Sequence, residues 1–136
     1  MSMIEGLSHL SFVVREIART ARLFEQVLDA REVHDSGPQG FSISPEKFLL
    51  IGGLWIALMQ GEGPAERSCR HVAFKIDESD FDDYARRIAA AGVDFRPPRP
   101  RVEGEGRSLC LHDFDNHLFE LHTGTLDERL ARYARN

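Results

Sequence analysis

Two histidines and one glutamate stand at matching places in a sequence that repeats itself. His9 opens the stretch HLSFVV, and His71 opens the similar stretch HVAFKI. Glu120 lies inside the later apolar stretch LFELH. Two imidazoles and one carboxylate bind a divalent ion and leave positions open for other ligands. An ion held in this way acts as a Lewis acid on a substrate oxygen. The sequence therefore predicts a metal-dependent enzyme with the ligands His9, His71 and Glu120.

The alternation of apolar and polar residues places all three side chains on one kind of strand face. His9 shares its face with Ser11, and His71 shares its face with Ala73, so both neighbours are small and leave room for a ligand. Glu120 alternates with two flanking apolar residues. An ionised carboxylate at such a position is costly unless it is paired or bound to a metal.

A count along the two repeats suggests what stands at the fourth equivalent position. Glu120 follows His71 by 49 positions (120 − 71), and the same offset from His9 falls on Leu58 (9 + 49). Leucine cannot bind a metal. We therefore expect Leu58 to leave the ion open to substrate.

The elements that must position these residues repeat as well. Apolar alternation predicts strands, and spacing of three or four predicts helices. In order, the expected elements are a strand 9–14, a helix 17–28, strands 30–35, 48–51, 54–60 and 71–76, a helix from about 79 to a cap at Gly92, strands 108–112 and 118–122, and a last helix opened by the capping box 125–128. This order predicts an α+β fold of paired βαβββ repeats that form a curved mixed sheet. We expect one domain over 1–136, with repeats at about 4–62 and 68–124 and a terminal helix at about 125–134.

The composition excludes several classes of protein. The chain has 136 residues, 42% of them hydrophobic, which suits one domain or two small fused units. The net charge is −5 with both signs interspersed, so we expect no binding to nucleic acid or to a membrane surface. The first residues do not resemble a signal peptide, and the two cysteines do not form a zinc or redox spacing. These features predict reduced thiols in a cytoplasmic protein.

The matched repeats with cleft-facing His, His and Glu resemble the vicinal oxygen chelate, or glyoxalase, superfamily. Within it, four stretches of the chain resemble the FosX-type fosfomycin resistance proteins: 41–48, 53–56, 99–108 and 115–126. The resemblance runs over nearly the whole chain.

This resemblance implies an antibiotic-resistance enzyme that uses metal and water to open the epoxide of fosfomycin, giving a diol. It implies a domain-swapped homodimer with shared active sites and one Mn²⁺ per subunit, although another divalent cation would suit the same ligands. His9 would come from one chain, and His71 with Glu120 from the other. Glu46 matches the glutamate that assists the attacking water. Beside Lys47, Glu46 would otherwise be read as half of a solvated surface pair.

The resemblance also implies a set of substrate contacts, mostly for the phosphonate group. These are Ser11, Trp55, Arg99, Arg101, Gly104, Glu105, Ser108, Cys110 and Arg129. Cys110 stands where relatives usually carry a tyrosine, and a thiol is a poor hydrogen-bond donor. We therefore expect weaker binding of fosfomycin than in those relatives. The remaining histidines, His34, His112, His117 and His122, are expected to be structural or solvent-facing.

Three alternatives stay open from the sequence. A thiol transferase would open the same epoxide with glutathione or another thiol. An oxygen-using enzyme is the second, because two histidines and one carboxylate also bind non-haem iron. A drug-sequestering protein of the same fold would bind its ligand without the metal.

Overall fold

The computed structural model describes residues 2–38, 44–96 and 102–135. The candidate contacts Arg99 and Arg101 lie outside the described residues. The chain forms two compact units, residues 1–65 and 66–136.

The first unit is a four-stranded sheet with one helix. Its strands lie in the order β1-β4-β3-β2, and β1 is parallel to β4 while the other pairs are antiparallel. The elements are β1 (His9–Val14), α1 (Ile17–Leu28), β2 (Arg31–Asp35), β3 (Glu46–Ile51) and β4 (Leu54–Gln60).

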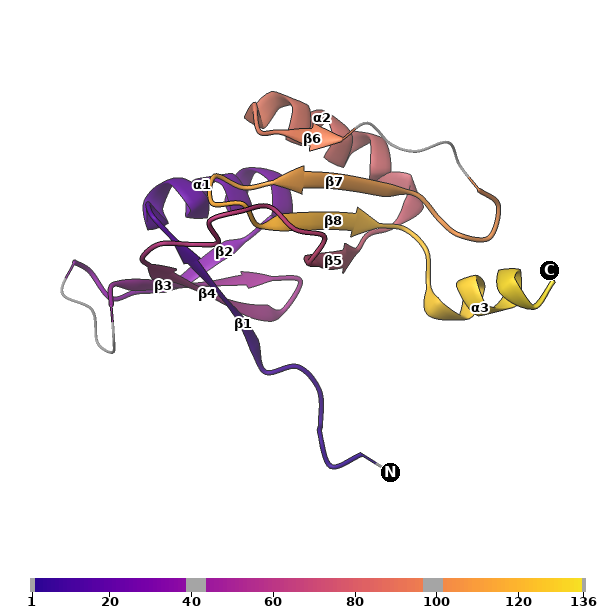
Figure 1. The fold of residues 1–136 in the computed structure, drawn as a ribbon, viewed down its shortest axis with the longest axis horizontal. Coiled ribbons are helices and arrows are strands. Elements are labelled where there is room, and N and C mark those ends of the chain that lie inside the picture. Colours follow the sequence, from indigo (N-terminus) through magenta and orange to yellow (C-terminus); the bar gives the residue numbers. More distant parts are fainter. Residues whose placement is uncertain (1, 39–43, 97–101, 136) are drawn as a thin grey trace. The chain divides into compact units, whose positions relative to one another are not determined.

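The second unit repeats this topology. Its strand order is β5-β8-β7-β6, again with one parallel pair, β5 and β8, at the start. The elements are β5 (His71–Lys75), the 3₁₀ turn η1 (Glu78–Asp80), α2 (Phe81–Ala91), β6 (Phe95–Arg96), β7 (Ser108–His112), β8 (Leu118–His122) and α3 (Leu126–Ala134). In Figure 1, α3 follows β8 and leads to the C-terminus. The predicted α+β fold of paired βαβββ repeats is confirmed.

Several boundaries differ from the prediction for local reasons. The strand β6 has only two residues, too few to show an alternating pattern, and it was not predicted. The helix α2 begins at Phe81 because a 3₁₀ turn, capped by the side chain of Asp77, comes first. The strand β3 begins at Glu46 rather than at residue 48. Gly92 ends α2 in the left-handed conformation, with φ of 71°, as predicted.

One face of each sheet is core, and the opposite face carries the candidate residues. In the first unit α1 buries Phe24 and Val27, and the strands bury Leu49 and Ile56. In the second unit the buried side chains include Ile88 of α2 and, on the strands, Leu109, Leu111, Phe119 and Leu121. Because side chains alternate along a strand, the polar candidates between these residues point to the other face.

The strand register corrects the expected place of Leu58. Glu120 lies opposite Ala73 in the β5–β8 pair, and the residue opposite Ser11 in the β1–β4 pair is Ala57. The first unit reaches this position one residue sooner, because His9 pairs with a residue 46 positions later (55 − 9) and His71 with one 47 positions later (118 − 71). The prediction for Leu58 is therefore wrong. Ala57 is the counterpart of Glu120, and Leu58 is fully buried on the other face.

A membrane-spanning helix would need a length and an apolar character that no helix among the described residues has.

The placement of Leu58 in the core gives a stability prediction. Leu58→Ala should lower the free energy of unfolding by about 2–5 kcal/mol, because it leaves a cavity in a fully buried site. Val33→Ala, on the edge strand β2 with the side chain half-exposed, should change it by no more than about 0.5 kcal/mol. Urea unfolding measures both values. Equal, small effects would contradict the assignment of Leu58 to the core.

Candidate metal and substrate site

His71 and Glu120 face each other on the open side of the second sheet. His71 begins β5, Glu120 lies in the middle of β8, and the two strands are neighbours. The His71 Nε2 and Glu120 Oε1 atoms are 3.4 Å apart. The His71 Nδ1 atom is 2.8 Å from the carbonyl oxygen of Cys69. Since a carbonyl only accepts hydrogen bonds, Nδ1 carries the hydrogen, and in the neutral ring a lone pair on Nε2 points towards the carboxylate.

Two acceptor atoms at this distance repel each other unless a proton on Nε2 or a metal ion lies between them. Two ligand atoms that are each about 2.1 Å from one ion, at angles of about 90–110°, are roughly 3.0–3.5 Å apart. The observed 3.4 Å falls within this range. A backbone carbonyl that fixes the histidine tautomer is also the usual arrangement behind a metal-binding histidine. His71 and Glu120 therefore fit a shared divalent ion.

The second carboxylate oxygen of Glu120 is held from the neighbouring strand. Ser108 Oγ donates to Glu120 Oε2 over 2.8 Å and also lies 2.7 Å from His122 Nδ1. The His122 Nδ1 atom is 3.4 Å from the same carboxylate oxygen. These contacts leave Oε1 as the oxygen that faces His71. Sequence reasoning placed Ser108 at the substrate and His122 in a structural role, and it did not predict their contact.

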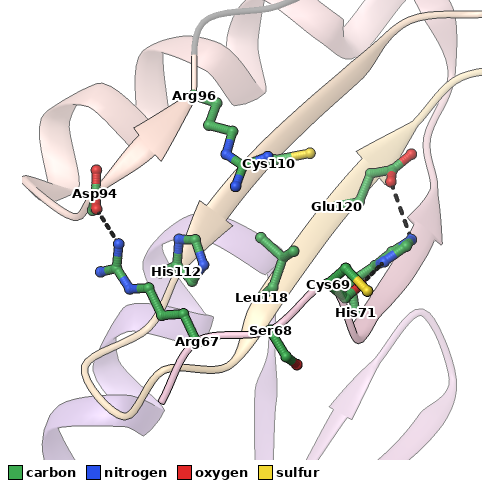
Figure 2. Close-up of a pocket in the computed structure, with 10 residues that line it drawn as sticks. All are labelled: Arg67, Ser68, Cys69, His71, Asp94, Arg96, Cys110, His112, Leu118 and Glu120. Atoms are coloured by element: carbon green, nitrogen blue, oxygen red, sulfur yellow. Dashed lines mark hydrogen bonds and ion pairs between the residues drawn. The ribbon is translucent and has the colours of Figure 1, made fainter.

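His71 and Glu120 line a pocket of about 460 Å³ on this face (Figure 2). Cys110 lies in it as expected, directly opposite Glu120 in the β7–β8 pair. Two arginines that sequence reasoning missed also line the pocket. Arg67 pairs with Asp94, and Arg96 lies opposite Cys110 in the β6–β7 pair. No pattern in the sequence marks either arginine, because only the folded chain brings them to the pocket. Arg96 lies on β6, and Arg67 lies in the segment before β5.

The charged groups in this pocket have both signs, with Arg67 and Arg96 on the wall beside Asp94 and Glu120. The hydrogen bond from Arg67 holds the pKa of the Asp94 carboxyl below its usual value, so this ion pair persists in mild acid. Burial, and after it the charge of Arg67, lower the pKa of His112, so that ring is neutral near pH 7. The cationic groups on the wall are therefore the two guanidinium groups. His112 also lines the pocket.

The first unit carries His9, Ser11 and Trp55 on the face away from α1. The His9 ring stacks on Trp55, with centroids 4.2 Å apart and planes at 29°. Phe48 continues the row at 5.1 Å from Trp55, and His34 follows at 4.9 Å from Phe48. This aromatic row of His9, Trp55, Phe48 and His34 crosses all four strands. Trp55 is 37% exposed, so it is not a core residue, and its ring is free to meet a ligand.

Glu46 lies on the same face of the first sheet, at the start of β3. Its neighbour Lys47 points to the opposite face and pairs with Glu32 at 2.8 Å and with Asp35 at 3.7 Å. The hydrogen bond to Glu32 raises the pKa of Lys47. The alternative reading of Glu46 and Lys47 as a surface ion pair is therefore wrong. Glu46 also borders a second pocket of about 500 Å³ at this end of the sheet, whose other walls include Lys47 and the start of α1, so this pocket is not part of the open face that carries His9.

Within the first unit Glu46 stands away from His9. It pairs with Met59, four residues along β4 from Trp55, which corresponds to about 13 Å along the strands. Both side chains project from the same face of the sheet. A molecule that met both would have to lie over that face.

Three of the predicted substrate contacts, Gly104, Glu105 and Arg129, lie near one another at the loop before β7. Arg129 of α3 donates to the carbonyl oxygen of Glu105 over 3.2 Å and to the Tyr133 hydroxyl over 3.2 Å. Gly106 has φ of 74°, and a Cβ there would lie 2.5 Å from the backbone nitrogen of Gly124. Only glycine allows this close approach of the loop to the chain after β8. The loop containing Gly104 and Glu105 is thus held against Arg129.

Among the described residues of one chain, no three His, Cys, Asp or Glu side chains form a complete metal site. His71 and Glu120 supply two ligands within the second unit. His9 belongs to the first unit. The pair in the second unit is therefore a partial site.

Comparison with known proteins identifies the family. Residues 6–121 match the model of the Glyoxalase/Bleomycin resistance protein/Dioxygenase superfamily. The chain is 63% identical over 133 residues to the fosfomycin resistance protein FosX of Mesorhizobium japonicum, with 98% of this chain and 96% of that protein covered. The chain belongs to the glyoxalase superfamily, among its FosX-type members.

Two further relatives bear on the chemistry of this FosX-type chain. A crystal structure of a FosX variant from Listeria monocytogenes, complexed with Mn(II) and 1S,2S-dihydroxypropylphosphonic acid, matches it with a TM-score of 0.86. The identity is 48%, and the match covers 96% of this chain and 99% of that chain. The metallothiol transferase FosB of Shouchella clausii is 36% identical over 140 residues, covering 98% of this chain and 90% of that protein.

The stacking of His9 on Trp55 gives a direct test of His9 as a ligand. Trp55 is the only tryptophan of the chain, so tryptophan fluorescence reports only on the surroundings of Trp55. Adding Mn(II) to the metal-stripped protein should quench the emission, because the paramagnetic ion would bind the ring that stacks on the indole. His9→Ala should abolish the quenching, and His34→Ala, at the other end of the aromatic row, should preserve it. Equal quenching with His9→Ala would exclude His9 as a ligand.

Proposed function

We propose that this protein is a Mn(II)-dependent fosfomycin resistance enzyme that adds water to the epoxide of fosfomycin and releases the diol. The observation that carries the proposal is the opposed acceptor pair, His71 Nε2 and Glu120 Oε1 at 3.4 Å, in a FosX-type chain. The ligand named with the Listeria structure, dihydroxypropylphosphonic acid, is fosfomycin plus one water molecule. The same addition is the reaction proposed here.

The metal would be held by His9, His71 and Glu120. The bound ion supplies Lewis acidity, which polarises the epoxide oxygen and stabilises the negative charge that develops on it when the ring opens. Mn(II) is the ion named with the relative, and other divalent ions suit the same donors. The chain contributes the fixed tautomer of His71 and the fixed carboxylate of Glu120, which need no rearrangement when the ion arrives.

The complete site is proposed to lie between two copies of the chain in a domain-swapped homodimer. One copy would supply the open face of its first unit, with His9. The other would supply the open face of its second unit, with His71 and Glu120. A symmetric dimer built in this way contains two equivalent sites.

Glu46 is proposed as the general base. A carboxylate can take a proton from water as the water attacks the carbon that bears phosphorus. Glu46 suits this role because its side chain points to the open face of the first sheet while its neighbour Lys47 is engaged on the other face.

The phosphonate would be held by cations and donors around the second-unit pocket. Arg96 lies beside Cys110, and the loop held by Arg129 borders the same sheet. The Ser108 hydroxyl already donates to Glu120, so it would border the substrate without donating to the phosphonate. Ser11 and Trp55 would meet the substrate from the first unit. Arg99 and Arg101, outside the described residues, stay in the proposal on the family resemblance alone.

A thiol transferase is the second candidate, favoured by the likeness to FosB. Glu46 favours water, because a thiol nucleophile needs no carboxylate base at that place. The Glu46 variant below separates the two reactions.

Glu46→Gln should lower kcat for hydration by about 10²–10⁴, because it removes the base and leaves the metal ligands in place. Phosphorus NMR of fosfomycin with enzyme and Mn(II), with and without glutathione, measures diol and thiol adduct separately. Glu32→Gln, which removes a nearby carboxylate on the other face, should retain activity. Product that forms only with glutathione would overturn the assignment to hydration.

Cys110→Tyr should raise kcat/KM for fosfomycin, mainly through a lower KM. The phenol is a better hydrogen-bond donor than the thiol, and the position lines the pocket opposite Glu120. Steady-state kinetics at saturating Mn(II) measures the change. An unchanged or lower kcat/KM would show that Cys110 does not limit substrate binding.

A further inference from the structure

His122 is a neighbour of Glu120 that the proposed chemistry does not use. It lies on β8 directly opposite Ser108 of β7, two residues after Glu120. Its side chain is 20% exposed, the same as that of Glu120. Its Nδ1 atom is 2.7 Å from Ser108 Oγ, and the Ser108 hydroxyl is 2.8 Å from Glu120 Oε2.

The hydrogens in this chain of contacts can be assigned from the chemistry of each group. An ionised carboxylate only accepts, so the single Ser108 hydrogen goes to Glu120. Towards His122 the Ser108 oxygen must then accept, and His122 Nδ1 must donate. The three groups form a directed chain from His122 through Ser108 to Oε2 of Glu120. The opposite order would leave two acceptors 2.8 Å apart.

The His122 ring is itself held by close packing. A Cβ added at Gly124 would come within 2.8 Å of His122 Nε2 and 3.0 Å of the Glu105 carbonyl oxygen. The ring therefore lies over a glycine that allows the approach. A ring fixed in this way can hold the serine hydroxyl in one orientation.

We propose that His122 is a positioning residue for the metal ligand Glu120 and that it acts through Ser108. By donating to Ser108 it points the hydroxyl at Oε2, which fixes the carboxylate with Oε1 towards His71. Without this donor the hydroxyl can turn, and Glu120 loses its fixed orientation. The inference rests on the proposed metal site and adds the groups that orient it.

The test is the affinity of the metal-stripped full chain for Mn(II), measured by calorimetry without substrate. His122→Ala should weaken binding by about 10–100-fold, the range expected when a partner of a metal ligand is removed. His122→Asn should bind Mn(II) nearly as well as the unchanged protein, because the amide N–H can replace the Nδ1 donor. His122→Asn as weak as His122→Ala would overturn the hydrogen-bonding role.

A double-mutant cycle shows whether His122 acts through the serine. Ser108→Ala should weaken Mn(II) binding as His122→Ala does, and the double variant should be no weaker than Ser108→Ala alone. Fully additive losses would overturn the relay.

A structural control and the unchanged protein complete the experiment. His117→Asn removes a histidine that pairs with Asp113 at 2.7 Å in the β7–β8 turn, and it should leave Mn(II) affinity unchanged. His122→Ala that binds like the unchanged protein would overturn the inference while leaving the metal site intact. An unchanged protein that binds no Mn(II) would instead overturn the metal site, and this inference with it.

Discussion

A neutral imidazole nitrogen and a carboxylate oxygen that face each other across 3.4 Å repel unless a proton or a metal ion lies between them. In water each would find a hydrogen-bond donor. Here the Cys69 carbonyl fixes the hydrogen of His71 on Nδ1, and Ser108 occupies the other oxygen of Glu120. The strand register keeps the two groups together, since β5 and β8 are adjacent and Ala73 opposite Glu120 takes little space. The protein therefore holds the two groups in a geometry that fits a divalent ion.

The two halves of the chain share one topology but carry different side chains on their open sheet faces. Both units bury one sheet face and leave the other open, in the same strand order. The open face of the second unit carries the ligand pair and the guanidinium groups of Arg67 and Arg96. The open face of the first unit carries His9 on Trp55, with Glu46 farther along the strands. Ala57 stands where the second unit has Glu120, so the repeats contain three of the predicted ligands rather than four.

The alternation of apolar and polar residues made the strands of the sheet predictable. Applying one offset to both repeats failed, because the spacing between the paired strands differs by one residue. The bounds of β1, β4, β7 and β8 agree with the prediction because the side chains of each strand point alternately to the core and to the opposite face. The offset that pointed to Leu58 missed a one-residue difference between the repeats. Pairing across strands revealed it, and a single sequence does not contain that information.

The missed site residues share a physical cause. Arg96 reaches the pocket through the two-residue strand β6, and Arg67 reaches it from the segment before β5. His122 has the same alternation as any sheet residue, and only its contact with Ser108 distinguishes it. Tertiary contacts between single polar residues leave no periodic signal in a sequence. The roles of His9, His71, Glu120 and Glu46 stay predictions that the geometry supports.

The central claim is that a working site takes His9 from one chain and Glu120 from another. The most direct measurement mixes two inactive variants, His9→Ala and Glu120→Gln, under conditions in which subunits exchange, and follows diol formation by phosphorus NMR. In a shared-site dimer each mixed dimer contains one intact site and one doubly altered site, so an equal mixture should recover about a quarter of the unchanged activity. A mixture that stays as inactive as its components, after exchange has been demonstrated, would contradict the account.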